Sequence, residues 1–318
     1  MDELVLQTKD LTKRYGTGDS ARLAVDRVSM TVRRGEVYGF LGPNGAGKTT
    51  TLRMVLGLIR PTAGSATVLG RPAGEPETTA RIGALIEGPG FYPYLSGRDN
   101  LRTMARYRGL PDDIADAALE RVDLAGRGRD RFKSYSLGMK QRLGVAAALM
   151  GDPDVIVLDE PTNGLDPAGM ADMRALIVDL ARGGQTVLLS SHLLAEVEEI
   201  CDRVGVIAGG RLLVESTVSA LRGGRRLRLV ATPIDQALAV AMRIAGDEAV
   251  QLDRDAVLLD VPAERMPHVV RSLVTEGLDV HEATISERTL EDVFFEMTDT
   301  GLHPQTGDLE PTSLEAVR

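Results

Sequence analysis

The sequence predicts an α/β core followed by a smaller α+β domain, and three patterns lead to this prediction. Short apolar runs at 155–158, 186–189 and 204–207 are each followed by a helix or turn signal, which is typical of buried, mostly parallel strands. A glycine-rich loop at 42–49 lies between an apolar run and a helical pattern. Near the C-terminus, the pattern at 226–285 has the order strand, helix, strand, strand, helix, strand. That order is typical of the split βαββαβ, or ferredoxin-like, motif.

Length and composition indicate a folded protein with more than one domain. The chain has 318 residues, of which 43% are apolar and 26% charged, and one domain usually contains roughly 100 to 200 residues. The longest apolar stretch, Leu143–Gly151, is far shorter than the roughly 18 residues that a membrane-spanning helix requires. The first residues contain neither a basic leader nor an apolar signal core. We therefore expect a cytoplasmic protein, and a partner must supply any membrane part of its activity.

Charge and the metal-binding residue types argue against several functions. A formal net charge of -9 argues against a surface built to bind a nucleic-acid backbone, so no nucleic-acid partner is expected. The four histidines and the single cysteine, Cys201, have no metal-ligand spacing. Cys201 lies in an apolar helical pattern, which favours a buried structural thiol. The sequence therefore favours neither a zinc site nor a cysteine nucleophile.

The N-terminal two thirds of the chain are predicted to contain a strand, loop and helix core with two smaller subdomains. Alternating runs at 4–11 and 23–32 predict an antiparallel β subdomain. An apolar strand at 36–41 leads into the glycine-rich loop and a helix at 49–59. Residues 97–150 have mostly helical patterns, which predicts a helical subdomain. Its helices are expected at 98–108, 112–122 and 137–150.

A basic, glycine-rich segment at 221–226 has no apolar periodicity and marks the predicted domain boundary. Residues 1–222 form the predicted core domain, and residues 223–298 form the accessory α+β domain. A short amphipathic helix is expected at 290–297. The polar residues 299–318 are predicted to form a mobile tail.

The loop at 42–49 reads GPNGAGKT and matches G-x-x-x-x-G-K-[ST], in the strand-to-helix context that binding of phosphates requires. Glycines let backbone N–H groups converge on the phosphates, Lys48 neutralises the outer ones, and Thr49 offers a hydroxyl to Mg²⁺. Only five of the 37 basic residues are lysines, so a chance match is improbable. The sequence therefore predicts a P-loop NTPase core that binds ATP and Mg²⁺. The nucleotide-binding residues expected here are Gly42, Pro43, Asn44, Gly45, Ala46, Gly47, Lys48, Thr49 and Thr50.

Two adjacent carboxylates, Asp159 and Glu160, follow the apolar strand at 155–158. Open α/β sheets place ligands at the C-terminal ends of their strands. Asp159 is therefore a candidate magnesium ligand, and Glu160 is a candidate general base for the water that attacks the γ-phosphate. On its own the pair could equally be a helix cap, but its place downstream of the phosphate loop favours catalysis.

In their order these motifs resemble the ATPase subunits of ATP-binding cassette (ABC) transporters, over residues 1 to about 222. The resemblance implies that Tyr15 stacks on adenine. It also implies that 135–139, YSLGM, is the signature that the family writes L-S-G-G-Q, with Ser136 and Gly138 matching. In the family this segment closes on the nucleotide of the opposite subunit, which implies a dimer with shared sites. The degenerate signature resembles the antibiotic-export and self-immunity branch.

The same resemblance assigns three further residues. Asp166 falls in a loop similar to the dimer-contact loop of the family, and His192 closes a strand as the switch histidine does. Glu87 replaces the glutamine of the glutamine loop. Glu87 could reach magnesium through water, or it could be only a solvated loop charge. The aromatic segment at 89–93 suits a docking surface for a membrane subunit.

Two functions are compatible with these motifs. The first is the ATP-hydrolysing subunit of an ABC transporter, an exporter of a drug, antibiotic or lipid-like substrate, peripheral on the inner face of the cell membrane and bound to a separate integral membrane permease. The second is a soluble cassette ATPase that acts on nucleic acid or ribosomes. A single compact cassette and the acidic balance favour transport. Residues 290–295 are similar to the closing run of drug-export ATPases, and the C-terminal unit carries no catalytic constellation. This unit could stabilise the dimer, cover the ATPase core or sense a ligand. The sequence does not identify the substrate.

Overall fold

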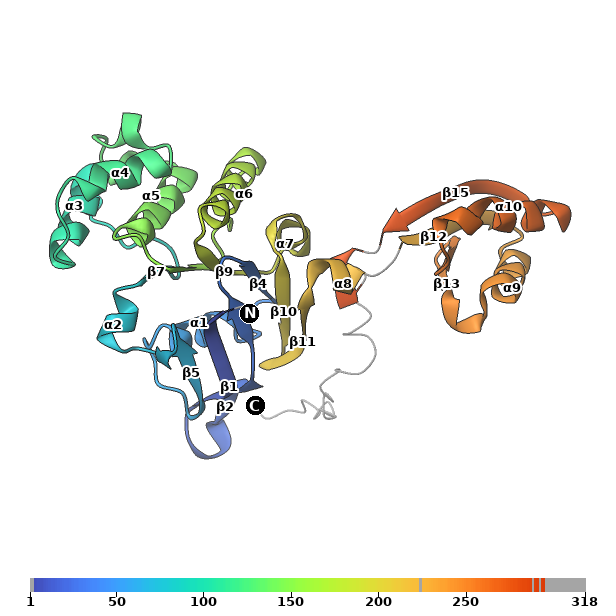
Figure 1. Cartoon of the computed structure of the whole chain (residues 1–318), viewed down its shortest axis with the longest axis horizontal. Helices are drawn as coiled ribbons and strands as arrows, with labels where there is room; N and C mark the ends of the chain where they lie inside the picture. The colour runs from blue at the N-terminus through green and yellow to red at the C-terminus, as the bar shows by residue number, and fades with distance from the viewer. Residues whose placement is uncertain (1–2, 223–224, 288, 292, 295–318) are drawn as a thin grey trace, which may run out of the picture. The chain divides into compact units, whose positions relative to one another are not determined.

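The computed structural model describes residues 3–222, 225–287, 289–291 and 293–294. The chain divides into two compact units, the first ending at Leu221 and the second beginning at Arg222 (Figure 1). The predicted mobile tail lies outside the described residues, as does much of the helix predicted at 290–297.

A six-stranded sheet with the order β11-β10-β4-β9-β8-β7 forms the centre of the first unit. Its neighbouring strands are parallel, except that β11 runs antiparallel to β10. Every residue of β4, β8 and β9 is buried, which is why these strands appear as continuous apolar runs. The prediction of a buried, mostly parallel sheet is therefore confirmed. The strands are β4 (Val37–Leu41), β7 (Ile82–Leu85), β8 (Val155–Asp159), β9 (Thr186–Ser191), β10 (Arg203–Ala208) and β11 (Arg211–Thr217).

A second, antiparallel sheet confirms the predicted β subdomain but has more strands than the sequence pattern indicates. The run predicted at 23–32 is split in two, because the Thr8 hydroxyl donates to Val28 O and accepts from Met30 N, so it replaces ladder bonds between strands. The run at 63–68 was not predicted, since its residues are mostly small or polar. The strands are β1 (Leu4–Tyr15), β2 (Arg22–Val28), β3 (Thr31–Arg33), β5 (Ala63–Val68) and β6 (Arg71–Pro72).

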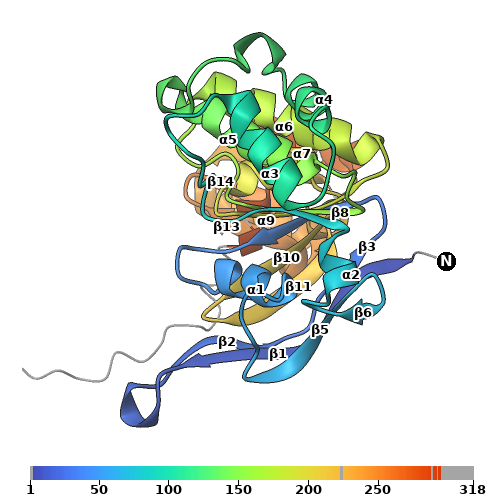
Figure 2. The same ribbon diagram turned by 90° about the vertical axis from the view of Figure 1, so that its left-hand side faces the viewer.

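Helix α1 (Lys48–Val55) contacts β1, β2 and β5 of one sheet and β8 of the other, so the two sheets share a hydrophobic core. Figure 2 shows the antiparallel strands at one end of this unit and a group of helices at the other. That group contains the predicted helical subdomain, formed by α3 (Gly97–Tyr107), α4 (Ile114–Arg121) and α5 (Leu137–Leu149). The remaining helices are α2 (Pro76–Thr79), α6 (Pro167–Arg182), α7 (Leu194–Ile200) and α8 (Val218–Arg222). No helix in the described part of the chain has the length and apolarity needed to cross a membrane.

Cys201 lies directly after α7 rather than within it, and its side chain is buried as predicted. Burial raises the pKa of the Cys201 thiol well above its usual range. The thiolate is therefore disfavoured, which agrees with a structural role.

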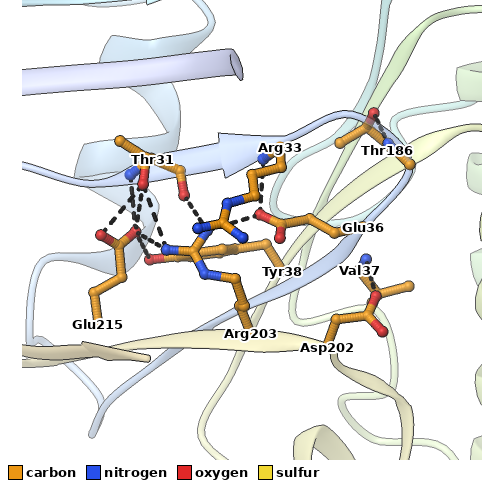
Figure 3. Close-up of polar contacts among 10 residues, drawn as sticks. Thr31, Arg33, Glu36, Val37, Tyr38, Thr186, Asp202, Arg203 and Glu215 are labelled. Atoms are coloured by element: carbon orange, nitrogen blue, oxygen red, sulfur yellow. Dashed lines mark hydrogen bonds and ion pairs between the residues drawn. The ribbon is translucent and has the colours of Figure 1, made fainter. Parts of the chain in front are cut away.

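A buried polar cluster connects the two sheets near the start of β4 (Figure 3). The Arg203 guanidinium donates to the Glu36 carboxylate at 3.1 Å and to the Thr31 carbonyl at 3.0 Å, and it lies 3.4 Å from Glu215. The Tyr38 hydroxyl donates to Glu215 at 2.9 Å. Burial raises the pKa of the Glu36 carboxyl, although hydrogen bonds from the Arg33 N–H and Arg203 oppose that shift. Arg203 therefore compensates two carboxylates, one directly before β4 and one on β11.

Arg203→Leu is expected to lower the free energy of unfolding by about 3–5 kcal/mol, because it leaves Glu36 and Glu215 without their buried cation. Urea unfolding followed by circular dichroism measures the change. Arg71→Leu is the matched control, since Arg71 is 55% exposed and pairs at the surface with Glu77, which is 73% exposed. The control should change stability by less than about 1 kcal/mol. If the two substitutions lowered the free energy of unfolding equally, the buried cluster would stabilise the fold no more than a surface ion pair does.

The second unit contains one four-stranded antiparallel sheet with the order β13-β14-β12-β15. Its elements follow the βαββαβ order, and buried side chains of α9 and α10 form a core with the sheet. The second helix of this pattern is preceded by a 3₁₀ turn, Ala263–Arg265. The elements are β12 (Arg225–Thr232), α9 (Ile234–Ala245), β13 (Val250–Asp253), β14 (Ala256–Leu259), α10 (Met266–Thr275) and β15 (Asp279–Glu287).

Candidate nucleotide-binding site

An open cleft of about 310 Å³ lies where the phosphate loop, the β1–β2 edge and the loop after β8 meet. Its lining brings together residues that are far apart in the sequence, most of which belong to the predicted motifs. The lining residues are Tyr15, Arg22, Ala24, Pro43, Asn44, Gly45, Gly47, Lys48, Thr49, Thr50, Glu160 and Asn163.

The phosphate loop connects β4 to α1, and its backbone requires glycine at the two ends. A Cβ on Gly42 would lie 2.2 Å from the carbonyl oxygen of Ile207. Gly47 has a φ of 109°, which is unfavourable for residues with a side chain. Lys48 Nζ, which is almost completely buried, donates to the carbonyl of Gly42 at 2.6 Å and that of Pro43 at 3.3 Å. The loop thus holds its lysine beside the cleft.

Asp159 and Thr49 meet at the end of β8. The Thr49 hydroxyl donates to Asp159 at 2.8 Å, and the Ser190 hydroxyl donates to its other carboxylate oxygen at 2.5 Å. Ser190 lies on β9, the neighbour of β8 in the sheet. A carboxylate beside a hydroxyl is an oxygen donor set of the type that Mg²⁺ prefers. The residues present therefore fit the predicted magnesium site.

Glu160 is held between the phosphate loop and the end of β9. One of its carboxylate oxygens lies 3.1 Å from Lys48 Nζ, and the other lies 2.6 Å from Nδ1 of His192. Its backbone has a φ of 50°, and its N–H donates to the Ser190 hydroxyl at 3.0 Å. A non-glycine residue in this left-handed region is uncommon and is often found at active sites. The structure thus brings together Lys48, Glu160 and His192.

Ser136, Gly138 and Asp166 are not among the residues that line the cleft of the single chain. Ser136 is exposed at the start of α5, where its hydroxyl accepts from the Met139 N–H at 3.2 Å. Asp166 caps α6 in the same way, accepting from Gly169 N–H. Both residues are helix caps within one chain, and their predicted contacts with a nucleotide stay predictions.

The described contact of Glu87 lies at the surface and does not involve Asp159 or Thr49. Its carboxylate lies 2.5 Å from the Arg53 guanidinium of α1, and its side chain is 60% exposed. This ion pair is the solvated arrangement that the sequence left open for Glu87. A contact with magnesium through water stays a prediction.

The aromatic segment predicted as a docking surface is partly buried. The Phe91 ring packs edge-on against Phe132, with ring centroids 5.3 Å apart. Tyr92 and Tyr94 are instead exposed and stack beside each other, with centroids 5.7 Å apart. Two adjacent tyrosines therefore remain available on this surface.

Sequence patterns did not single out Arg22, Ala24 or Ser190 as site residues. No sequence signal connects Arg22 to the site, because only the register of β1 and β2 places it opposite Tyr15. Ser190 precedes the predicted switch histidine, but only the pairing of β8 with β9 shows that it orients Asp159.

The fold and the site define a P-loop NTPase, and comparisons with known proteins identify its family. The family model described as "ABC transporter" matches residues 25–163. The chain is 40% identical to the bacitracin transport ATP-binding protein BcrA of Bacillus licheniformis, covering 93% of this chain and 98% of that protein. It is 37% identical to the daunorubicin resistance ATP-binding protein DrrA3 of Streptomyces coeruleorubidus, covering 94% of this chain and 97% of that protein. The chain belongs to the family of ABC transporter ATP-binding subunits, and it is an ATPase.

Solved structures agree with this assignment. An ATP-binding subunit of an ABC transporter is 28% identical, with a TM-score of 0.60, over 69% of this chain and 92% of that chain. The cbiO1 protein of Clostridium perfringens, described as part of the ABC transporter complex cbiONQ, is 25% identical, with a TM-score of 0.62, over 76% of this chain and 96% of that chain.

Proposed function

We propose that this ATPase drives the export of a drug, antibiotic or lipid-like molecule through a separate integral membrane permease. In this function it works as a dimer at the inner face of the cell membrane. The contact of Glu160 with both Lys48 and His192 at the mouth of the phosphate loop supports the ATP hydrolysis that drives this export. The names of the bacitracin and daunorubicin relatives support the class of substrate.

Hydrolysis begins with an exchange of partners at Lys48. Its described partners are two loop carbonyls and the Glu160 carboxylate. The phosphates of ATP take the place of the Glu160 carboxylate beside Lys48. The two carbonyls stay bound to the lysine, because they belong to the phosphate loop itself. The released Glu160 accepts the proton of the attacking water as the water oxygen bonds to the γ-phosphorus and the bond to ADP breaks. Through its ring nitrogen, His192 keeps the carboxylate oriented.

Thr49 and Asp159 are the residues that would hold Mg²⁺. When bound, the ion neutralises charge on the β- and γ-phosphates. The Ser190 hydroxyl donates to one oxygen of Asp159 and so fixes the orientation of the carboxylate. Thr49 Oγ1 and Asp159 Oδ2 already lie together before any ion enters.

Dimerisation follows from the position of the signature. Ser136 caps a helix, and a helix N-terminus with a hydroxyl that can still donate its hydrogen is suited to an anion. Because Ser136 and Gly138 do not line the cleft of their own chain, we assign them to the nucleotide of the partner chain. The signature and the loop that precedes Asp166 pack together within one chain. A Cβ added to Gly164 in that loop would lie only 3.0 Å from the Leu137 side chain of the signature.

The permease is proposed to dock on Tyr92 and Tyr94. Tyrosines are enriched at protein interfaces, because they combine apolar area with a polar hydroxyl. These two rings are exposed beside each other, while Phe91 anchors the segment to the helical subdomain. A cassette ATPase acting on nucleic acid or ribosomes is the alternative, and the formal net charge of -9 argues against it.

The double variant Tyr92→Ser/Tyr94→Ser is expected to bind the permease roughly thirtyfold more weakly, and so to lose most of its membrane association in cells that contain the permease, since truncation of two interface aromatics at about 1 kcal/mol each costs about 2 kcal/mol. The measurement is the fraction of chain that sediments with membranes. Binding of ATP to the purified variant should not change, because neither tyrosine lines the cleft.

Tyr107→Ser is the matched control for this experiment. Tyr107 is also a tyrosine of the helical subdomain, and it is 94% exposed at the end of α3. This control should sediment as the unchanged chain does. If the double variant stayed with the membranes, docking through Tyr92 and Tyr94 would be wrong.

A further inference from the structure

Arg22 is a cation at the nucleotide cleft that the hydrolysis mechanism does not use. It lies on β2, outside the phosphate loop and the other sequence motifs, yet it lines the same cleft as Lys48 and Thr49. Its side chain is exposed, so it contributes nothing to the hydrophobic core.

The register of β1 and β2 places Arg22 directly opposite Tyr15. Direct partners in an antiparallel pair project their side chains from the same face, with Cβ atoms roughly 5 Å apart. An adenine that stacks on Tyr15 would therefore lie beside Arg22.

The same strand also runs against the phosphate loop. The carbonyl oxygen of Ala24 lies 2.5 Å from the position that a Cβ on Gly47 would occupy. Nη2 of Arg22 lies 3.9 Å from the corresponding position on Gly45. The guanidinium therefore extends over the loop, between the tyrosine edge and the phosphate-binding backbone.

The electrostatic state of Arg22 differs from that of Lys48. Lys48 is buried and already paired with Glu160. Within the described ranges, no carboxylate forms an ion pair with Arg22, whereas Arg27 on the same strand pairs with Asp26 at 3.3 Å. A guanidinium without a carboxylate partner, beside a phosphate-binding loop, is suited to bidentate binding of phosphate.

We propose that Arg22 is a second cationic contact for the phosphate chain of the nucleotide, approaching it from the β1–β2 edge. This inference rests on the proposed ATP site and adds a positioning residue to it. Lys48 exchanges Glu160 for phosphate, whereas Arg22 gives up no ion-pair partner among the described side chains when it binds phosphate.

The test is a set of calorimetric titrations of the full chain with adenosine, AMP, ADP and a non-hydrolysable ATP analogue. Arg22→Gln is expected to weaken binding of the ATP analogue about tenfold, as loss of a charge-assisted hydrogen bond at an exposed site predicts. Adenosine should bind as before, and the loss should decrease at high salt. Arg22→Lys should recover part of the affinity because it retains the charge.

Arg27→Gln is the matched control, because Arg27 lies on the same strand, is 69% exposed and does not line the cleft. It should bind every ligand as the unchanged chain does. An equal loss for adenosine and the ATP analogue in Arg22→Gln, or no loss at all, would overturn the inference.

A further variant separates failure of this inference from failure of the proposed ATP site. Lys48→Ala removes the loop cation and should weaken binding of the ATP analogue on its own. If Lys48→Ala weakens binding and Arg22→Gln does not, only the role of Arg22 is wrong. If the unchanged chain binds no nucleotide, the proposed site itself is wrong.

Discussion

Glu160→Gln is expected to lower the rate of ATP hydrolysis by at least about a hundredfold while ATP still binds. Glutamine retains the shape of the side chain and can still hydrogen-bond to His192, but it cannot accept the proton of the attacking water. The substitution also removes the ion pair with Lys48, which lies 3.1 Å from the carboxylate in the absence of nucleotide. Binding of ATP should therefore be unchanged or stronger, and only the chemical step should be lost.

Steady-state phosphate release and nucleotide titration of the same preparation measure the two effects separately. Glu199→Gln is the matched control, since Glu199 is a 60% exposed glutamate that pairs with Arg174 away from the cleft. The control should hydrolyse ATP normally. A Glu160→Gln chain that retains most of its turnover would remove Glu160 from the role of general base.

Ser136→Arg is expected to abolish hydrolysis, although the isolated chain still binds ATP through its own cleft. Ser136 is exposed at the first turn of α5, and a large side chain there would prevent close approach to the γ-phosphate on the partner chain. Binding should survive because Tyr15, Lys48 and Thr49 belong to the other side of the site. Ser136→Ala, which removes the cap without adding bulk, should weaken the helix start by about 1 kcal/mol and retain part of the turnover.

Mixing of variants tests whether the site is shared. In a heterodimer of Ser136→Arg with Lys48→Ala, both changes fall on one composite site, because the phosphate loop of one chain faces the signature of the other. The second site is intact, so some hydrolysis should return. If the mixed dimer forms and remains inactive, either the two sites cannot hydrolyse independently or the signature assignment is wrong. Full turnover of Ser136→Arg alone would refute the signature assignment directly.

The sequence predicted the parts of the site that consist of consecutive residues. The phosphate loop and the pair Asp159 and Glu160 could be recognised because each lies at the C-terminal end of an apolar strand. The contact of Glu160 with His192 joins segments 32 residues apart, and the sequence placed both residues at strand ends. The sequence also predicted the buried parallel strands, because a strand that is buried on both faces needs a continuous apolar run.

Contacts that depend on sheet register or on tertiary packing were not recoverable in this way. Ser190 orients Asp159 only because β8 and β9 are neighbours, and Arg22 reaches the cleft only because it pairs with Tyr15. The break between β2 and β3 depends on the hydroxyl of Thr8, which is distant in the chain. The sequence left Glu87 either near magnesium or as a solvated loop charge, and its described partner, Arg53, comes from α1. Sequence spacing carries no information on these partners.

The molecular mass of the Glu160→Gln chain in solution, measured with and without ATP and Mg²⁺, tests most directly whether two chains share the ATP site. Because ATP cannot be hydrolysed, each nucleotide should remain held between the phosphate loop of one chain and Ser136 of the other. The predicted result is a monomer without nucleotide and a dimer with ATP, and the dimer should be absent when Ser136→Arg is added to the same chain. A chain that binds ATP and remains monomeric, or one that dimerises equally with and without ATP, would contradict a shared site.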